Sequence, residues 1–182
     1  SNSFKGYTSI TSLTLSEGIT TIKSNAFEGC IGIKSLVLPE SLKTIETKAF
    51  YGIQITSITI PKATTKIESD TFGGISSLNT IIYKGDSNPC GENINAFTQA
   101  TTEYVEVEIE YTSQNMCGKL PRTKRSCGVN TAACTYTYMH NDKSMKIEGN
   151  GAMTDWNSIN DVPWKIKQTA ISSITINGIS NV

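Results

Sequence analysis

His140 is the only histidine among the 182 residues of the chain, and histidine is the side chain that most readily moves protons near neutral pH. The usual sites of proton transfer and acyl transfer place such a group beside a second histidine or a nucleophilic cysteine. The sequence offers neither a second histidine nor a Cys/His pair at nucleophile spacing. We therefore expect His140 to lie at a hairpin turn, in a protein that is not an enzyme and needs no cofactor.

Carboxylates are the second group that could do chemistry, as ligands of Ca²⁺ or as an acid–base pair. Glu106, Glu108 and Glu110 alternate along one stretch, so successive carboxylates would lie about 7 Å apart on a strand, too far for a compact Ca²⁺ site without other ligands. We interpret them as the solvated edge of a sheet. Asp155 and Asp161 are expected to serve in turns, and no metal site is predicted.

Four basic residues gather in residues 115–126, NMCGKLPRTKRS: Lys119, Arg122, Lys124 and Arg125. They could contact anionic glycans or nucleic acid, or form a dibasic processing site. The chain as a whole carries 16 basic and 16 acidic residues, so it lacks the positive excess of a nucleic-acid-binding protein. We predict an exposed basic linker loop between two folded blocks, and nucleic acid is not an expected partner.

Four of the five cysteines, Cys90, Cys117, Cys127 and Cys134, fall close together and include no Cys-x-x-Cys pair. This spacing fits disulfide bonds made in an oxidising compartment better than a zinc site, and it leaves the pairing open. A reduced protein with free thiols is the alternative. Cys30 lies within a repeat and is expected to be a small buried hydrophobic residue.

The first part of the chain consists of a repeat of about 23 residues, which is long enough for one supersecondary unit. Its anchors follow one another at intervals of 23, 23 and 22 residues: Phe4, Phe27, Phe50 and Phe72. Residues 10–32, 33–54 and 55–77 align with one another along their length. A fourth unit is modified by a longer loop at 85–93.

Each unit opens with an alternating run such as Leu13-Thr14-Leu15, whose period of two is typical of a strand with one buried face. A turn, a second short extended piece and an Ala-Phe turn, expected to be one helical or 3₁₀ turn, complete the unit. Such a unit cannot bury its apolar side alone, so neighbouring units must stack. The predicted fold is mainly β, a solenoid with a parallel strand ladder, and the phenylalanines point inward.

The chain changes character after the repeats. Tyr104–Tyr111 (YVEVEIEY) is predicted to be the last strand of a block covering 1–114, with glutamates that discourage pairing at an exposed edge. Residues 127–170 are predicted to form a β-rich spacer with a hairpin that turns near Asn141-Asp142. Residues 171–182 match the opening of the repeat and are expected to begin a second block. Because both ends of the chain fall within units, we expect a fragment of a longer array or a subunit that abuts other copies.

The outward side chains of the strand ladder are the predicted partner-binding residues: Ser12, Thr14, Ser35, Val37, Ser57, Thr59, Thr80 and Ile82. Rungs about 4.8 Å apart would make this strip a docking face for an extended partner. The solvated side of a sheet that binds nothing is an equally good interpretation of the same residues.

The repeat pattern, LxxIxLPxxLxxIxxxAFxxC, resembles the BspA-like leucine-rich repeats of bacterial and protist surface proteins. The segment GNGAMTDW at 149–156 is similar to part of that family's β-rich spacer, whereas Ala63 and Thr64 replace the usual apolar residue after the third turn. The resemblance implies a leucine-rich-repeat solenoid, an extracellular or cell-surface location, and a protein or glycan ligand on a host or matrix surface, often in adhesion. A structural element that stacks end to end on its own copies or on further repeats is the alternative. No apolar run is long enough to span a membrane.

Overall fold

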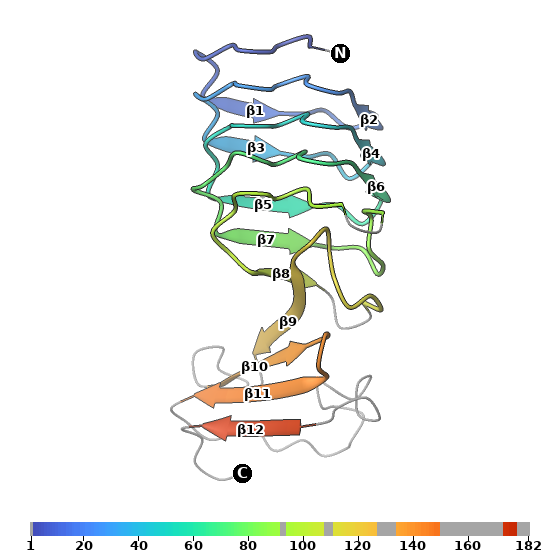
Figure 1. The fold of residues 1–182 in the computed structure, drawn as a ribbon, viewed down its shortest axis with the longest axis vertical. Coiled ribbons are helices and arrows are strands. Elements are labelled where there is room, and N and C mark those ends of the chain that lie inside the picture. Colours follow the sequence, from blue (N-terminus) through green and yellow to red (C-terminus); the bar gives the residue numbers. More distant parts are fainter. Residues whose placement is uncertain (1, 92–93, 108–110, 127–133, 150–172, 178–182) are drawn as a thin grey trace.

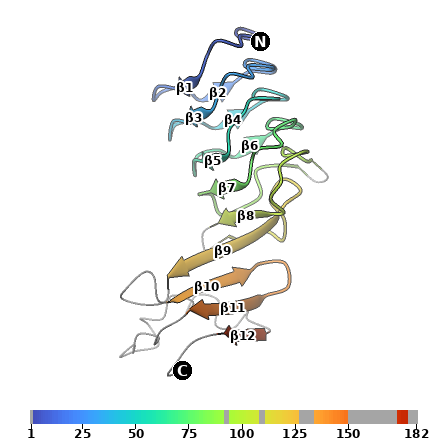
Figure 2. The ribbon, with the colours of Figure 1, turned by 90° about the vertical axis from the view of Figure 1, so that its left-hand side faces the viewer.

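The chain winds into stacked coils in a computed structural model that describes all residues except 1, 92–93, 108–110, 127–133, 150–172 and 178–182 (Figure 1). One face of the stack, which we call the strand face, carries β1 (Ser12–Thr14), β3 (Ser35–Val37), β5 (Ser57–Ile60), β7 (Thr80–Tyr83) and β8 (Tyr104–Val107). A second face carries β2 (Thr21–Ile22), β4 (Thr44–Ile45) and β6 (Lys66–Ile67). Figure 2 shows from the side how each coil lies directly below the preceding one. The predicted solenoid is confirmed.

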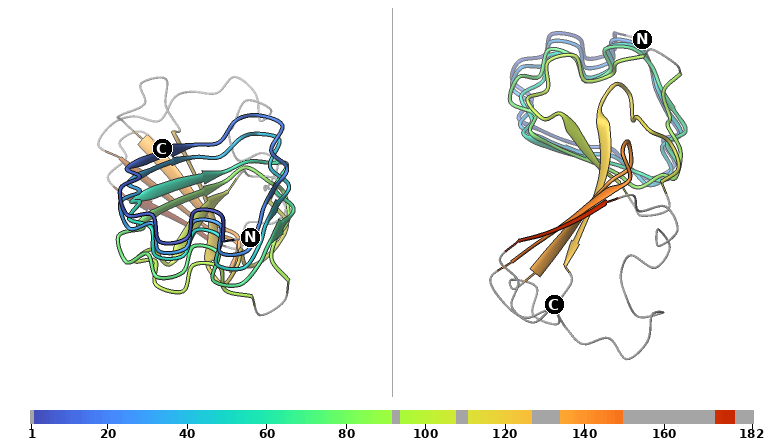
Figure 3. Two further views of the ribbon diagram at one scale, coloured as in Figure 1. Left: turned by 90° about the horizontal axis from the view of Figure 1, so that it is seen from above. Right: turned by 60° about the horizontal axis from the view of Figure 1, so that its bottom comes forward.

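The strand face continues beyond the coils as one mixed sheet. Its further strands are β9 (Leu120–Ser126), β10 (Cys134–Met139), β11 (Ser144–Gly149) and β12 (Ser173–Asn177). β9 lies parallel to β8 and antiparallel to β10, and β12 lies parallel to β11, so a seven-stranded sheet runs from β5 to β12. The β10–β11 pair confirms the predicted hairpin. Figure 3 shows that the last strands cross the direction of the coil strands, as the twist of a sheet requires.

Two predictions about this part of the chain are wrong. Residues 120–126 of the predicted linker loop form β9, because Pro121 and Thr123 are buried on one face of the sheet. The strand that starts at Tyr104 is not an edge strand, because β8 pairs with β7 on one side and β9 on the other. Glu106 therefore faces Arg122 across the ladder, with Oε1 3.4 Å from a guanidinium nitrogen, where the sequence suggested an open edge.

The interior of the coils is organised by a column of phenylalanine rings. The centroids of successive rings are 5.3–5.5 Å apart and their planes are within 10° of parallel, from Phe4 through Phe27, Phe50 and Phe72 to Phe97. The last four rings are buried, whereas Phe4 is 46% exposed. The N–H groups of the first four phenylalanines each donate to a carbonyl of the next coil, as from Phe27 to Ala49 at 2.8 Å, whereas the Phe97 N–H donates to the Asn95 side chain. The constant spacing confirms that neighbouring coils share one interior.

The Ala-Phe turns are tight turns without helix. A left-handed residue stands just before the Ala-Phe or Thr-Phe pair in three successive coils, with φ of 57° at Asn25, 54° at Lys48 and 54° at Asp70. A right-handed helical turn needs consecutive negative φ values, so such a residue interrupts it. The one helical or 3₁₀ turn expected here is accordingly a series of turns, and the described residues include no helix.

Glutamates bind the second and third coils each to the one before it. The Ser24 N–H and hydroxyl both donate to one oxygen of Glu46, at 3.0 and 3.1 Å, and Thr47 does the same to Glu68 in the next coil, at 3.1 and 3.0 Å. The Lys23 ammonium, 2.7 Å from the Glu46 carboxylate, and the Ser24 N–H hold the pKa of Glu46 below its usual range. These bonds satisfy turn donors that would otherwise lie between coils.

Candidate interaction surface

The strand face brings together the residues predicted to bind a partner. Parallel pairing places Ser12 beside Ser35 and Thr14 beside Val37 in one sheet, and Ser57 beside Thr80 and Thr59 beside Ile82 in another. The six members in the first three coils are exposed, and Thr80 and Ile82 are half-buried. Val37 exposes 53% of its surface, which is unusual for a side chain of its size and apolarity. The two files of side chains therefore lie on one accessible face.

The ladder of this face is interrupted between the second and third coils. β1 pairs with β3 and β5 pairs with β7, whereas β3 and β5 belong to different sheets. The two coils stay joined elsewhere, because β4 pairs with β6 and the rings of Phe50 and Phe72 stack at 5.5 Å. The opening is thus a local splay of the strand face within a continuous stack.

A missing residue accounts for the interruption. Ile33, the first apolar position of the next strand, follows Phe27 by six positions, but Ile55 follows Phe50 by only five. The main-chain bond at the entry to the third coil shifts accordingly. The Gln54 N–H, one residue before Ile55, donates to the Ile33 carbonyl at 2.8 Å, whereas in the preceding coil the N–H one residue after Ile33 donates to Thr11. The shorter loop holds the start of β5 out of register with β3.

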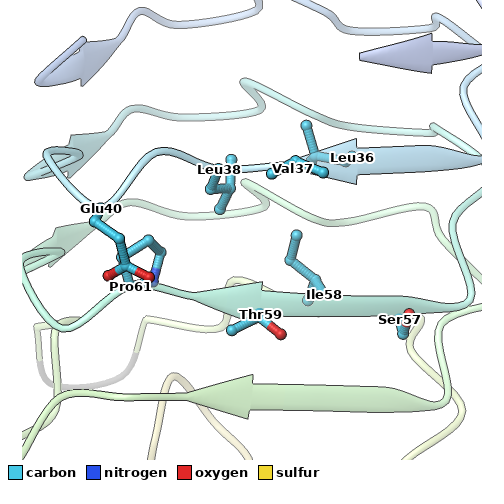
Figure 4. Close-up of a pocket in the computed structure, with 8 residues that line it drawn as sticks. All are labelled: Leu36, Val37, Leu38, Glu40, Ser57, Ile58, Thr59 and Pro61. Carbon is cyan, nitrogen blue, oxygen red and sulfur yellow. The ribbon is translucent and has the colours of Figure 1, made fainter. Parts of the chain in front are cut away.

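The splay creates a cleft of about 300 Å³ between β3 and β5, which we call the β3–β5 cleft (Figure 4). Its exposed lining is more polar than apolar, and the residues that line it are Leu36, Val37, Leu38, Glu40, Ser57, Ile58, Thr59 and Pro61. Three of the predicted partner-binding residues, Val37, Ser57 and Thr59, line it. The other five lie on the strand face outside the cleft.

Main-chain groups also face this cleft. The Val37 carbonyl accepts from Leu15 in the first coil, and the Ile60 carbonyl accepts from Lys84 in the fourth, so both point away from the opening. Because the direction alternates along a strand, the peptide groups of Leu36, Ser57 and Thr59 point into it. With no β3–β5 pairing in the described sheets, these groups make no ladder bonds across the cleft.

Glu40 supplies the charge at one end of the cleft, beside Pro61 (Figure 4). The Lys84 ammonium extends from the end of β7 past the third coil to lie 3.2 Å from the Glu40 carboxylate. The two side chains expose 64% (Glu40) and 46% (Lys84) of their surfaces, so water competes with this ion pair. The Glu40 N–H donates to Glu17 and holds the pKa of that carboxyl below its usual range, which makes this end of the strand face rich in carboxylates.

The predicted basic cluster does not form one exposed loop. The Lys119 ammonium donates to the Ala100 carbonyl at 3.3 Å, and burial lowers the pKa of this lysine. Arg122 pairs with Glu106 and lies over the Tyr104 ring, 4.9 Å from its centroid. Lys124 and Arg125 belong to β9, where the structure describes only their main chain. Lys119 and Arg122 therefore have partners within the fold.

The cysteine predictions have separate outcomes. Cys90 and Cys117 form a disulfide with Cα atoms 5.2 Å apart, and the Asn88 side-chain oxygen accepts the N–H of each at 3.1 Å. Cys30 is confirmed as a buried free thiol, and it donates to the Phe4 carbonyl at 2.9 Å. Cys134 begins β10, and Cys127 lies outside the described residues, so a second disulfide stays a prediction.

His140 lies at the hairpin turn, as expected, and it is buried there. It follows β10 directly and exposes only 7% of its surface. Its Nε2 lies 2.9 Å from the Thr123 hydroxyl and its Nδ1 lies 3.0 Å from the Tyr111 carbonyl. These contacts join the hairpin to β9 and to the end of the coils. The sequence carried no signal for them, because Thr123 and Tyr111 lie far from His140 along the chain.

Across the part of the chain that is described, no three histidine, cysteine or acidic side chains lie close enough together to hold a metal ion. The same residues include no apolar helix of membrane-spanning length.

Comparison with known proteins gives one family and one related structure. A family described as "BspA type Leucine rich repeat region" matches residues 1–117 with six copies of its repeat. A leucine-rich cell surface protein of Faecalibacterium prausnitzii A2-165, known from a crystal structure, aligns with 66% of this chain at 20% identity and a TM-score of 0.48. The alignment spans 43% of that protein's chain. No significant match was found among curated protein sequences.

Proposed function

Because the chain belongs to the BspA-type leucine-rich-repeat family, we propose that it is a non-catalytic interaction module that binds other macromolecules through its strand face. The observation that carries this proposal is the β3–β5 cleft, where exposed side chains and unpaired peptide groups gather on an otherwise regular sheet. Peptide groups without ladder partners favour an extended polypeptide ligand, which can offer donors and acceptors at matching intervals.

We further propose that the module works outside the cell or at its surface, in adhesion to host or matrix proteins or to their glycans. The disulfide between Cys90 and Cys117 supports an oxidising environment.

The test is binding of the purified full chain to immobilised matrix proteins, with two matched variants. Thr59→Lys adds a long charged side chain to the cleft, whereas Thr65→Lys adds it to an exposed threonine of the same coil beside β6. We expect saturable binding that Thr59→Lys weakens at least about tenfold, as expected when a charge replaces a central contact, and that Thr65→Lys preserves. An absence of saturable binding, or equal losses in both variants, would refute the proposal.

Self-association is a second candidate, favoured by an apolar surface on the first coil. Phe4, Leu15 and Ile19 border a cleft of about 270 Å³ there, with Phe4 46% exposed. Another coil, from a second copy, would cover these side chains. Sedimentation velocity over a hundredfold range of concentration separates the two candidates, because a chain that stays monomeric throughout does not stack end to end.

A further inference from the structure

The β3–β5 cleft combines three features that one type of side chain would satisfy together. Its exposed apolar contact is Val37, beside Leu36, Leu38 and Ile58, whose side chains pack into the core. Glu40, the only charged residue among those that line it, stands at one end. Peptide carbonyls of β3 and β5, which do not pair with each other, point into the opening between them. We propose that the cleft binds an arginine side chain of an extended polypeptide partner, an inference that rests on the proposed function and specifies its ligand.

The chemistry of arginine matches each feature. Its three methylene groups can lie against the exposed Val37 side chain while the charged head stays in contact with water. Its guanidinium carries five N–H donors and no acceptor, so it can bond both to a carboxylate and to neighbouring carbonyls. Lysine offers a single donor group that cannot bind a carboxylate in the same two-pronged way.

The chain itself already holds a cation at this position. The Lys84 ammonium lies 3.2 Å from Glu40, although 44 residues separate the two along the sequence. Both side chains are largely exposed, so this contact is weak and a ligand can displace it. Lys84 therefore acts as an internal competitor for the carboxylate that the partner's arginine would bind.

The test uses two synthetic peptides that differ in one group. Both are capped, alternate threonine and valine, and carry at the centre either arginine or citrulline, which has the same shape without the charge. Binding to the full chain is measured by NMR titration, with the signals of Val37 and Thr59 as reporters of the cleft. We expect the arginine peptide to bind at least about tenfold more tightly, the range typical of one charge-assisted hydrogen-bonding pair.

Three variants assign the effect to Glu40. Glu40→Gln should weaken the arginine peptide about tenfold and leave the citrulline peptide unchanged. Lys84→Met should strengthen the arginine peptide, because the competitor is gone. Glu103→Gln removes an exposed carboxylate that does not line the cleft and should change nothing. Circular dichroism checks that each variant keeps its fold.

Each contrary result overturns the inference. Equal binding of the two peptides, no binding of either, or equal effects of Glu40→Gln and Glu103→Gln would show that the cleft does not select arginine. If Thr59→Lys still abolishes binding to a matrix protein in that case, the strand face remains the docking surface and only its ligand chemistry was assigned wrongly. If neither experiment shows binding, both proposals fail.

Discussion

Replacing Phe50 with alanine would remove the middle ring of the phenylalanine column. Phe50 is fully buried and stacks on Phe27 and Phe72, with both pairs of centroids 5.5 Å apart. Truncation of a buried phenylalanine lowers the free energy of unfolding by about 3–5 kcal/mol, because the apolar contacts are lost and a cavity remains. Loss of two stacked pairs, each worth about 0.5–1.5 kcal/mol beyond area burial, places Phe50→Ala toward the upper part of that range.

Phe4 provides the matched comparison within the same column. It stacks on one neighbour only, Phe27 at 5.3 Å, and is 46% exposed, so water can fill the space that its ring leaves. We expect Phe4→Ala to lower the free energy of unfolding by about 1–1.5 kcal/mol, roughly half the transfer energy of a buried ring. Urea unfolding followed by circular dichroism measures both values. Equal losses for the two variants, or a loss below about 1 kcal/mol for Phe50→Ala, would refute the shared interior.

Three further predictions concern the disulfide, the cleft and acid stability. Replacing Cys90 and Cys117 together with alanine should lower the free energy of unfolding by about 3–4 kcal/mol, since the bond closes a loop across a sequence separation of 27; urea unfolding that is unchanged by the replacement would contradict this. Inserting a glycine after Gln54 restores the loop length of the neighbouring units and should allow β3 to pair with β5, so peptide binding in the cleft should be lost. NMR titration of the variant measures this binding. Unaltered binding would exclude our explanation of the splay. The pKa values of Glu46 and Glu68 are lower in the folded protein than the ordinary carboxyl value of 4.5, so their ionised forms stabilise the fold above that pH, and this stability is lost as the pH falls through the lower values. The melting temperature, measured from pH 7 to pH 2, should therefore fall in this window. It should fall less for Glu46→Gln.

Regular spacing made the coils predictable from the sequence. The phenylalanine interval and the alternating strand pattern recur in every unit, so their spacing alone predicts both the stacking of the units and the side chains that face the interior. The 22-residue interval after Phe50 was equally visible. Its consequence was not, because only the three-dimensional stack shows that a missing residue in the loop before β5 separates this strand from β3.

The end of the coils was less predictable because polar residues carry the structure there. Thr123, a polar residue, lies on the buried face of the sheet, and Arg122 lies on the more exposed face. Strand β9 therefore lacks the alternation of apolar and polar residues by which a strand is recognised in a sequence. The contacts of His140 and the ion pair between Glu40 and Lys84 join residues far apart in the chain. Such contacts depend on register between coils, which composition and local spacing do not encode.

Amide hydrogen exchange along β5 tests most directly whether the strand face is open at this point. The N–H of Ile58 points toward β7 and should be protected by the ladder, whereas those of Ser57 and Thr59 point into the β3–β5 cleft. We expect the latter two to exchange about a hundredfold faster or more, at rates typical of exposed loops. Equal protection of all three amides would mean that β3 and β5 are paired, and the proposed docking site would not exist.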